Sequence, residues 1–167
     1  MAATTVVKVR RDGTITFADN AGFGGANTYT VAYENGDLSF NREKSDRVVI
    51  RDRGAIAGLR KADDPVNQIS FSVHMRDFTD GTSDALVDVL DFAGAASGWT
   101  TTGGTGYEEK LLDIKITVEG SNHGDSADHT ATFTKVLFIW DFAEGDPNVV
   151  NVSGEIYGGA PTLTGQA

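Results

Sequence analysis

The sequence predicts a mainly β protein with a β-sandwich or barrel-like fold and one flanking α-helix. Segments in which apolar and polar residues alternate recur along the chain, which is typical of half-buried strands. Twenty glycines against three prolines in 167 residues suit many strands joined by turns. Only one segment has the helical spacing of apolar residues. The length and the lack of a linker predict a single domain over residues 1–167.

The strongest strand signal is a hairpin over Thr130–Tyr157, which we expect at the centre of the sheet. Beyond Val136 both alternating faces of its first strand are apolar, so we expect this half of the strand to be covered on both sides. The connection breaks the ladder at Gly145 and Pro147, since glycine frees the backbone and proline donates no hydrogen bond. The partner strand follows at once.

Two dipeptides upstream are strong hairpin signals. Asp12-Gly13 separates two short β-forming segments, and Asn35-Gly36 predicts that residues 37–41 pair with residues 27–33. Residues 54–65 read as either a loop or a short extended arm. The remaining strand candidates are residues 48–53, 66–76 and 111–119.

One helix is expected at about residues 83–93, where it would seal an open end of the sheets. Ser83 is placed to cap its first turn, and Gly94 to end it. The glycine-rich residues 94–106 then form a long loop with Trp99 as its one large apolar residue. The apolar stripe of the helix is Leu86, Val89, Leu90 and Ala93.

No cluster of polar residues matches a catalytic or metal-binding motif. The nearest is a group of two histidines and two aspartates, whose spacing fits no compact metal motif and suits a solvated hairpin tip instead. Zero cysteines exclude disulfides and thiolate chemistry. We therefore expect no enzyme activity, no metal and no cofactor. The four residues of the group are His123, Asp125, Asp128 and His129.

The net charge of −10 is unevenly placed along the chain. Residues 1–60 hold nine basic and seven acidic residues, whereas residues 61–167 hold five basic and seventeen acidic ones. A chain this acidic should not bind nucleic acid non-specifically, because such binding depends on Lys and Arg displacing counterions. No apolar run approaches the roughly 20 residues of a membrane span and no signal peptide is evident, so we expect a soluble, unexported protein.

Long loops and asymmetric charge favour a head-to-tail interface that closes into a ring. Within residues 54–65 apolar side chains alternate with charged pairs, which suits an arm that docks on a neighbouring subunit. The expected contacts between subunits or rings are Arg47, Arg51, Arg53, Ile56, Leu59, Arg60, Lys61, Asp63 and Asp64.

Two C-terminal segments, Phe142–Asn148 and Val152–Gly158, carry a family resemblance. Upstream, the segment Arg60–Pro65, the strand Ile69–Met75, the single helix and the strand Leu112–Val118 follow in the same order. Over about residues 45–158 the chain resembles the tail tube proteins, or major tail proteins, of long-tailed bacteriophages.

The resemblance implies a tail-tube fold assembled into stacked six-fold rings around a channel for double-stranded DNA. Implied partners are other copies of the chain, a tape-measure protein, tail-terminator and baseplate proteins and, in a contractile tail, a sheath. The location implied is the virion tail after synthesis in the host cytoplasm. Carboxylates on the channel wall would repel phosphate; the candidates are Asp113, Glu119, Glu155, Asp37 and Glu34.

Two alternatives stay open from the sequence. A monomeric carbohydrate-binding module could stack sugars on exposed aromatic side chains and hold calcium at the Asp/His loop. The aromatic candidates are Trp99, Tyr107, Tyr29 and Tyr33. The chain could also form the tube of a related contractile injection or secretion system.

Overall fold

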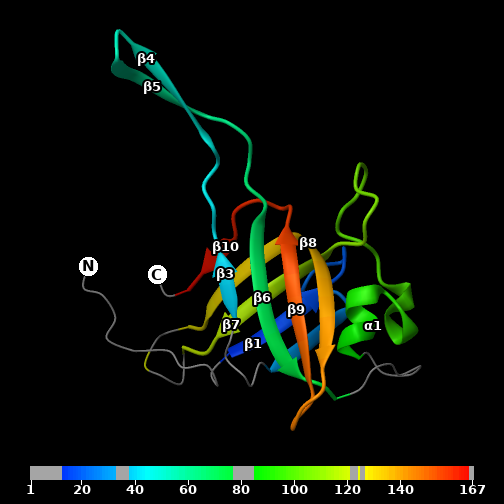
Figure 1. Cartoon of the computed structure of the whole chain (residues 1–167). Coiled ribbons are helices and arrows are strands. Elements are labelled where there is room, and N and C mark those ends of the chain that lie inside the picture. The colour runs from blue at the N-terminus through cyan, green and yellow to red at the C-terminus, as the bar shows by residue number, and fades with distance from the viewer. Residues whose placement is uncertain (1–12, 33–37, 77–84, 121–123, 125–126, 166–167) are drawn as a thin grey trace.

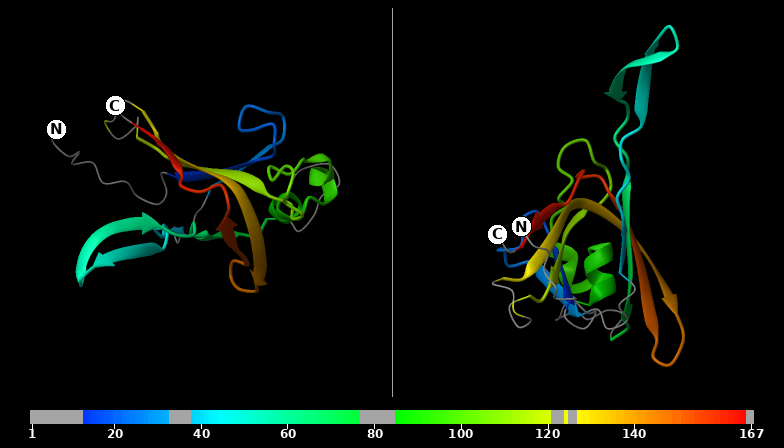
Figure 2. Two further views of the ribbon diagram at one scale, coloured as in Figure 1. Left: turned by 90° about the horizontal axis from the view of Figure 1, so that it is seen from above. Right: turned by 90° about the vertical axis from the view of Figure 1, so that its left-hand side faces the viewer.

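A computed structural model describes residues 13–32, 38–76, 85–120, 124 and 127–165 (Figures 1 and 2). The described residues form a mainly antiparallel β structure with one short α-helix, as the sequence predicts. The elements are β1 Gly13–Ala18, β2 Thr28–Ala32, β3 Ser39–Asn41, β4 Arg47–Asp52, β5 Ala55–Lys61, β6 Asn67–His74, α1 Leu86–Asp91, the 3-10 helix η2 Gly94–Gly98, β7 Leu112–Val118, β8 His129–Ala143, β9 Val149–Ile156 and β10 Thr162–Thr164.

Strand β8 is the centre of the large sheet, which runs in the order β2-β1-β7-β8-β9-β6-β3. Its first half pairs with β7 on one side and β10 on the other, and its second half pairs with β9. Figure 1 shows β8 curving from the layer of β7 and β1 to the layer of β9 and β6. The long C-terminal hairpin predicted as the sheet centre is confirmed.

A bulge in β8 allows it to belong to both layers. The register with β7 shifts by one residue, and Lys135 takes a left-handed φ of 54°. Phe133 and Val136 are therefore both buried, although strict alternation placed them on opposite faces. Beyond the bulge Ile139 is 62% exposed, so the expected cover on the outer face of this half of β8 is absent from the described chain.

The two layers pack their inner faces together around Phe17. Its ring lies 6.1 Å from that of Phe71 and contacts Phe138 edge-on at 5.4 Å. The helix closes one end of this core through Leu86, Val89 and Leu90 of its predicted stripe, whereas Ala93, the fourth predicted member, follows the helix and is exposed. The other large buried side chains include Ile15, Ile114 and Ile116 from one layer, Ile69, Val150 and Val152 from the other, and Leu86, Val89 and Leu90 from α1.

The helix is shorter than the predicted residues 83–93. Its N-cap is Ala85, which makes no side-chain capping bond, while Ser83 lies outside the described residues. The left-handed residue that ends it is Phe92, with φ 53°, while Gly94, with φ 48°, begins η2. Gly94 is needed there because a Cβ would lie 2.5 Å from the Asp88 carboxylate. No helix of the described residues is long and apolar enough to cross a bilayer.

Two expectations about loops and pairing are wrong. Strand β3 pairs with β6 and not with β2, which pairs with β1, because Phe40 of β3 packs its ring 4.7 Å from that of Phe133 in the core. Trp99 is 7% exposed and belongs to the core, so the first part of the loop after the helix is packed and not an excursion. The Asp12-Gly13 and Asn35-Gly36 turns fall largely or wholly outside the described residues.

Candidate assembly surfaces

Strands β4 and β5 form a two-stranded hairpin, called the arm here, that projects away from the large sheet (Figures 1 and 2). Its turn is Arg53-Gly54, in which both residues have positive φ, 47° and 87°. Two-residue hairpin loops of this kind match the twist of the strands they join. Arg51 donates a side-chain hydrogen bond to the carbonyl oxygen of Gly54 at 3.3 Å. The arm alternative for residues 54–65 is thus confirmed, with residues 47–52 as its second strand.

One face of the arm is apolar at its centre and basic around it. Val49 lies opposite Leu59, and Ile56 lies opposite Arg51, so these side chains share a face. Ile56 is 67% exposed and Leu59 is 60% exposed. The basic residues of the same face are Arg47, Arg51 and Lys61.

The arm has too little cover to be stable by itself. A lone two-stranded hairpin is at best marginally stable in water, since it buries little apolar surface. Its other face adds exposed Val48 and Ile50. Contiguous exposed apolar surface of this kind marks an interaction site in a soluble protein.

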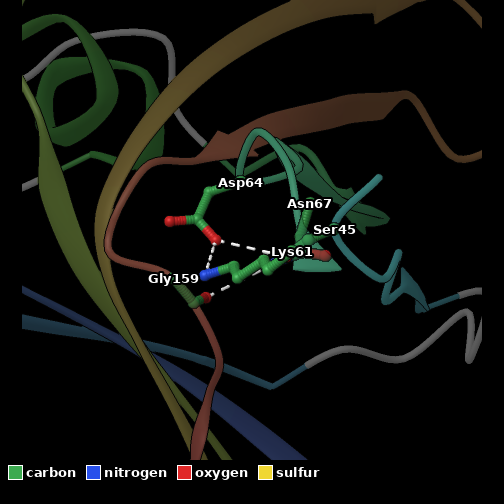
Figure 3. Close-up of polar contacts among 5 residues, drawn as sticks. All are labelled: Ser45, Lys61, Asp64, Asn67 and Gly159. Atoms are coloured by element: carbon green, nitrogen blue, oxygen red, sulfur yellow. Dashed lines mark hydrogen bonds and ion pairs between the residues drawn. The ribbon is translucent and has the colours of Figure 1, made fainter. Parts of the chain in front are cut away.

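Asn67 anchors the base of the arm to the sheet (Figure 3). Its side chain is 3% exposed, and its Oδ1 accepts the backbone N–H of Glu43 at 2.9 Å. Its Nδ2 donates to the carbonyl oxygen of Gly159 at 3.5 Å. One buried side-chain amide therefore joins three segments. They are the stem that leads into the arm (residues 42–46, the incoming stem), the start of β6 and the segment after β9.

Asp64 ties the two stems of the arm to each other. It forms an ion pair with Lys61 and accepts the hydroxyl of Ser45 at 3.3 Å (Figure 3). The hydrogen bond and charge of Lys61 lower the pKa of the Asp64 carboxyl. All three groups are exposed or half-buried, so the contacts direct the arm more than they stabilise the fold.

A cleft of about 900 Å³ lies at this base, between the stems of the arm and the segment after β9. Asn67, Tyr157 and Gly158 are among the residues that line it. Five basic residues against three acidic ones give its wall an excess of positive charge. The basic residues are Arg42, Lys44, Arg47, Arg60 and Lys61, and the acidic ones are Glu43, Asp46 and Asp64.

The outer face of strands β3, β6, β9 and β8 forms a second open surface. Cross-strand pairing aligns Asn41, Gln68, Glu155 and Leu137 in one row across the four strands. The face is largely polar and uncharged, with a shallow hollow of about 250 Å³. Its other members include Ser39, Ser70, Ser153, Asn151, Ile139 and Asp141.

The five predicted channel residues do not form one cluster. Glu155 lies on the outer face just described and accepts the Tyr157 hydroxyl at 2.6 Å. Asp113, at the start of β7, is half-buried and bonded to the bulge of β8. Glu119 follows the other end of β7, about 20 Å away along the strand. The last two candidates, Asp37 and Glu34, lie outside the described residues.

Those of the residues proposed for a sugar or calcium site that the structure describes do not gather on one exposed surface. Trp99 is buried, and Tyr29 packs against the core. Tyr107 is partly exposed, but its ring is covered by Lys135, whose Nζ lies 4.9 Å from the ring centroid. Among the described residues no three His, Asp or Glu side chains are placed to hold a metal ion. Tyr33, His123 and Asp125 lie outside the described part.

Sequence reasoning missed three features of these surfaces: the pairing of β4 with β5, the cleft, and the polar row on the outer face. The pairing had a signal, because Val48–Ile50 and Ile56–Leu59 flank a glycine-containing dipeptide at hairpin spacing. Arg53-Gly54 is less distinctive than Asn-Gly, so the turn was not recognised. The cleft and the row join residues far apart in the chain, and no local pattern reports them.

Comparison with protein-family models gives no match, and neither does comparison with curated proteins. Two solved structures share the fold over nearly the whole chain. A chain in the 6-fold symmetrised cryo-EM structure of the anti-feeding prophage (AFP) baseplate matches with a TM-score of 0.56 and 12% identity, covering 99% of this chain and 98% of that one. A chain in the PVC sheath/tube terminator of an extracellular contractile injection system, in the extended state, matches with a TM-score of 0.58 and 13% identity, covering 99% and 100%.

These matches establish the architecture. The chain shares its fold with one chain in each of two large assemblies. At 12 and 13% identity the role of this chain has to be argued from its own surfaces.

Proposed function

We propose that this protein is a structural subunit of a phage-tail-like particle, in which six copies form a ring and rings stack into a tube. The observation that carries the proposal is the arm: an uncovered apolar hairpin on a subunit that otherwise has a complete core. Its fold, shared over its full length with chains of a six-fold baseplate structure and a sheath/tube terminator, supports the same role. The arm would dock on a neighbouring copy through Ile56 and Leu59.

The large sheet has edges suited to ring closure. β7 pairs with β8 only as far as Val136, so along residues 137–143 the described strands supply β8 with a partner on the β9 side alone. At the far end of the sheet β3 is a three-residue edge. Exposed edges pair readily with other strands. Pairing of β3 from one copy with the second half of β8 in the next would continue the sheet around a closed barrel.

In such a ring the outer face of β3, β6, β9 and β8 lines the channel. Ser, Asn and Gln side chains present hydrogen-bonding groups without positive charge, and Glu155 and Asp141 add negative charge. A wall of this kind does not hold polyanions, because phosphate affinity depends on Lys and Arg. Double-stranded DNA is therefore a cargo that the channel could pass. The partners of the tube would be a tape-measure protein, a tail terminator, a baseplate and, in a contractile tail, a sheath.

A second candidate is the tube of a contractile injection system that delivers protein. It is favoured by the origin of the second match, an extracellular contractile injection system. The uncharged part of the channel face suits this cargo equally well. The two candidates share the ring, the stack and the arm, and they differ in the cargo recovered with assembled particles.

The proposal is tested by assembly of the purified full chain. Negative-stain images and sedimentation velocity should show rings or tubes that increase with protein concentration. The double variant Ile56→Ser/Leu59→Ser should remain folded but form no tubes, because the arm makes no strand pairing with the core and its docking face is lost. A matched control on the opposite arm face is Val48→Thr/Ile50→Thr. Monomers of the unaltered protein at all concentrations, or unchanged tubes from the Ile56/Leu59 variant, would contradict the proposal.

A further inference from the structure

The β8–β9 turn is an acidic projection. Asp141, Glu144 and Asp146 are exposed, and no Lys, Arg or His occurs from residue 136 to residue 148. The turn is shaped by its own hydrogen bonds: Gly145 N–H donates to Asn148 Oδ1 at 2.9 Å, and Asn151 Nδ2 donates to Asp141 Oδ1 at 2.8 Å. These hydrogen bonds fix the conformation of the turn, and with it the positions from which its carboxylates project.

The basic cleft lies at the opposite end of the same strands. Asn67 pairs with Ile156 beside the cleft, whereas His74 pairs with Val149 beside the turn. The eight residues of β6 separate the two ends by about 26 Å. Figure 1 shows the arm rising from one end of β6 and the β8–β9 turn extending from the other.

We propose that the acidic β8–β9 turn of one copy enters the basic cleft at the arm base of a second copy. The inference rests on the proposed function and names the contact by which successive rings stack. The two surfaces are oppositely charged. Within one chain they lie at opposite ends of the strands, too far apart to touch each other. A contact between different patches at opposite ends is head-to-tail, so repeating it builds an open stack.

The shape of the cleft agrees with this occupant. Its volume of about 900 Å³ is in the range of sites that enclose a ligand, so the tip of a turn can enter. Arg42 and Lys44 line the cleft from the stem that leads into the arm, and Arg60 lines it from the end of β5. An acidic tip would therefore be contacted from both sides. The arm rises from the same end and would lie alongside the incoming copy. Docking of the turn and docking of the arm are thus compatible in one interface.

Charge reversal on each side, followed by rescue, tests the contact. Glu144→Lys/Asp146→Lys should raise the concentration needed for assembly about tenfold, since it removes two exposed ion pairs and adds repulsion. Arg42→Glu/Lys44→Glu should do the same from the other side. The chain with all four changes should assemble close to the concentration of the unaltered protein, because the charges are again opposite. A control is Glu108→Lys, an exposed residue outside both surfaces.

Sedimentation velocity at low and high salt measures these thresholds, with circular dichroism as the check that each variant is folded. Added salt should weaken assembly of the unaltered protein, since the pairs are exposed. The turn-in-cleft contact is wrong if the Glu144→Lys/Asp146→Lys variant assembles at the same concentration as the unaltered protein. It is also wrong if the variant with all four changes assembles no better than either double variant. The proposed ring and arm would stand in both cases. If the unaltered protein forms no assemblies at all, the proposed function fails with it.

Discussion

Asp113 Oδ1 accepts the backbone N–H of Lys135 at 3.0 Å, at the bulge where β8 passes from one layer of the sandwich to the other. The bulge takes one amide out of the β7–β8 ladder, and the carboxylate replaces the lost acceptor. A residue selected from the sequence as a channel charge therefore has a structural task in this chain. That task gives the first prediction.

Asp113→Asn should be tolerated and Asp113→Ala should not. Asparagine keeps an oxygen that can accept the Lys135 N–H, whereas alanine leaves that partly buried donor without an acceptor. The expected loss for alanine is about 1 kcal/mol of unfolding free energy. Urea unfolding of the two variants measures the difference. Equal stability of the alanine variant and the unaltered protein would show that the hydrogen bond does not hold the bulge.

The same carboxyl predicts a pH dependence. Burial, the largest effect, raises the pKa of Asp113, against the opposing hydrogen bond from Lys135. A raised pKa means that the folded protein binds the proton more tightly than the unfolded chain does, so this group destabilises the fold above its folded pKa. Asp113→Asn should therefore equal or exceed the unaltered protein in stability at pH 7. This advantage should shrink as the pH falls toward the ordinary value of 3.8. An advantage that stays constant from pH 7 to pH 3.5 would contradict this assignment.

Asp19 should behave in the opposite way. It is 1% exposed and accepts hydrogen bonds from Ala21 N, Asn27 Nδ2 and both the N–H and hydroxyl of Thr100, at 2.8 to 3.1 Å. Burial alone would raise its pKa, but these hydrogen bonds together lower it below 3.8. Its contribution to stability is thus complete above pH 3.8 and is lost as the pH falls through the lower folded pKa.

The substitution Asp19→Asn is the sharpest check, because it is predicted to fail where Asp113→Asn succeeds. The new amide would direct its own N–H groups at donors, leaving at least one of them unpaired and buried. A loss of at least about 2 kcal/mol in unfolding free energy is expected at pH 7. Thermal unfolding of both asparagine variants side by side measures it. Similar stability of the two would argue against Asp19 as the hub of the loop between β1 and β2.

Local sequence pattern predicted the fold class, the central hairpin and the helix stripe because each depends on neighbours along the chain. It failed at the β8 bulge, since Lys135 is not a residue that marks positive φ. It failed at β3, whose three residues carry no periodicity and whose partner is set by Phe40 reaching the core. Among the candidate assembly surfaces, the sequence singled out Ile56 and Leu59, which are exposed on the arm, whereas the cleft depends on segments that meet only in space.

Within Val152–Gly158, one of the segments that carry the family resemblance, Gly154 has a packing role that sequence alone does not show. A Cβ on Gly154 would lie 2.8 Å from Val136 Cγ1 and 3.0 Å from both Ile69 Cγ2 and Phe138 Cδ1. Gly154→Ala should therefore overpack the core and cost about 1–3 kcal/mol of unfolding free energy. Ser153→Ala, its neighbour on the exposed face, is the control and should change stability far less. Urea midpoints that match for the two variants would show that the core yields easily at this point.

The last prediction concerns the charge of the proposed channel. Of the described candidates Glu155 is the best probe, because it lies on the open face of β9 with Gln68 and Leu137 beside it in the row. Asp113 is unsuitable, since a lysine there would also break the bulge contact. Glu155→Lys should leave the fold intact, because the half-buried Glu155 side chain lies at the surface of β9 and surface charge contributes little to stability. In a ring of six copies it would change the channel charge by twelve units for each ring.

Tubes of the Glu155→Lys variant should therefore retain double-stranded DNA at low salt and release it as salt rises, since phosphate binding weakens steeply with ionic strength. Glu108→Lys, which makes the same charge change at an exposed residue, is the control. Co-sedimentation of assembled tubes with DNA across a salt series measures both. Equal retention by the two variants would mean that the face of β3, β6, β9 and β8 does not line the path, and that another surface of the ring does.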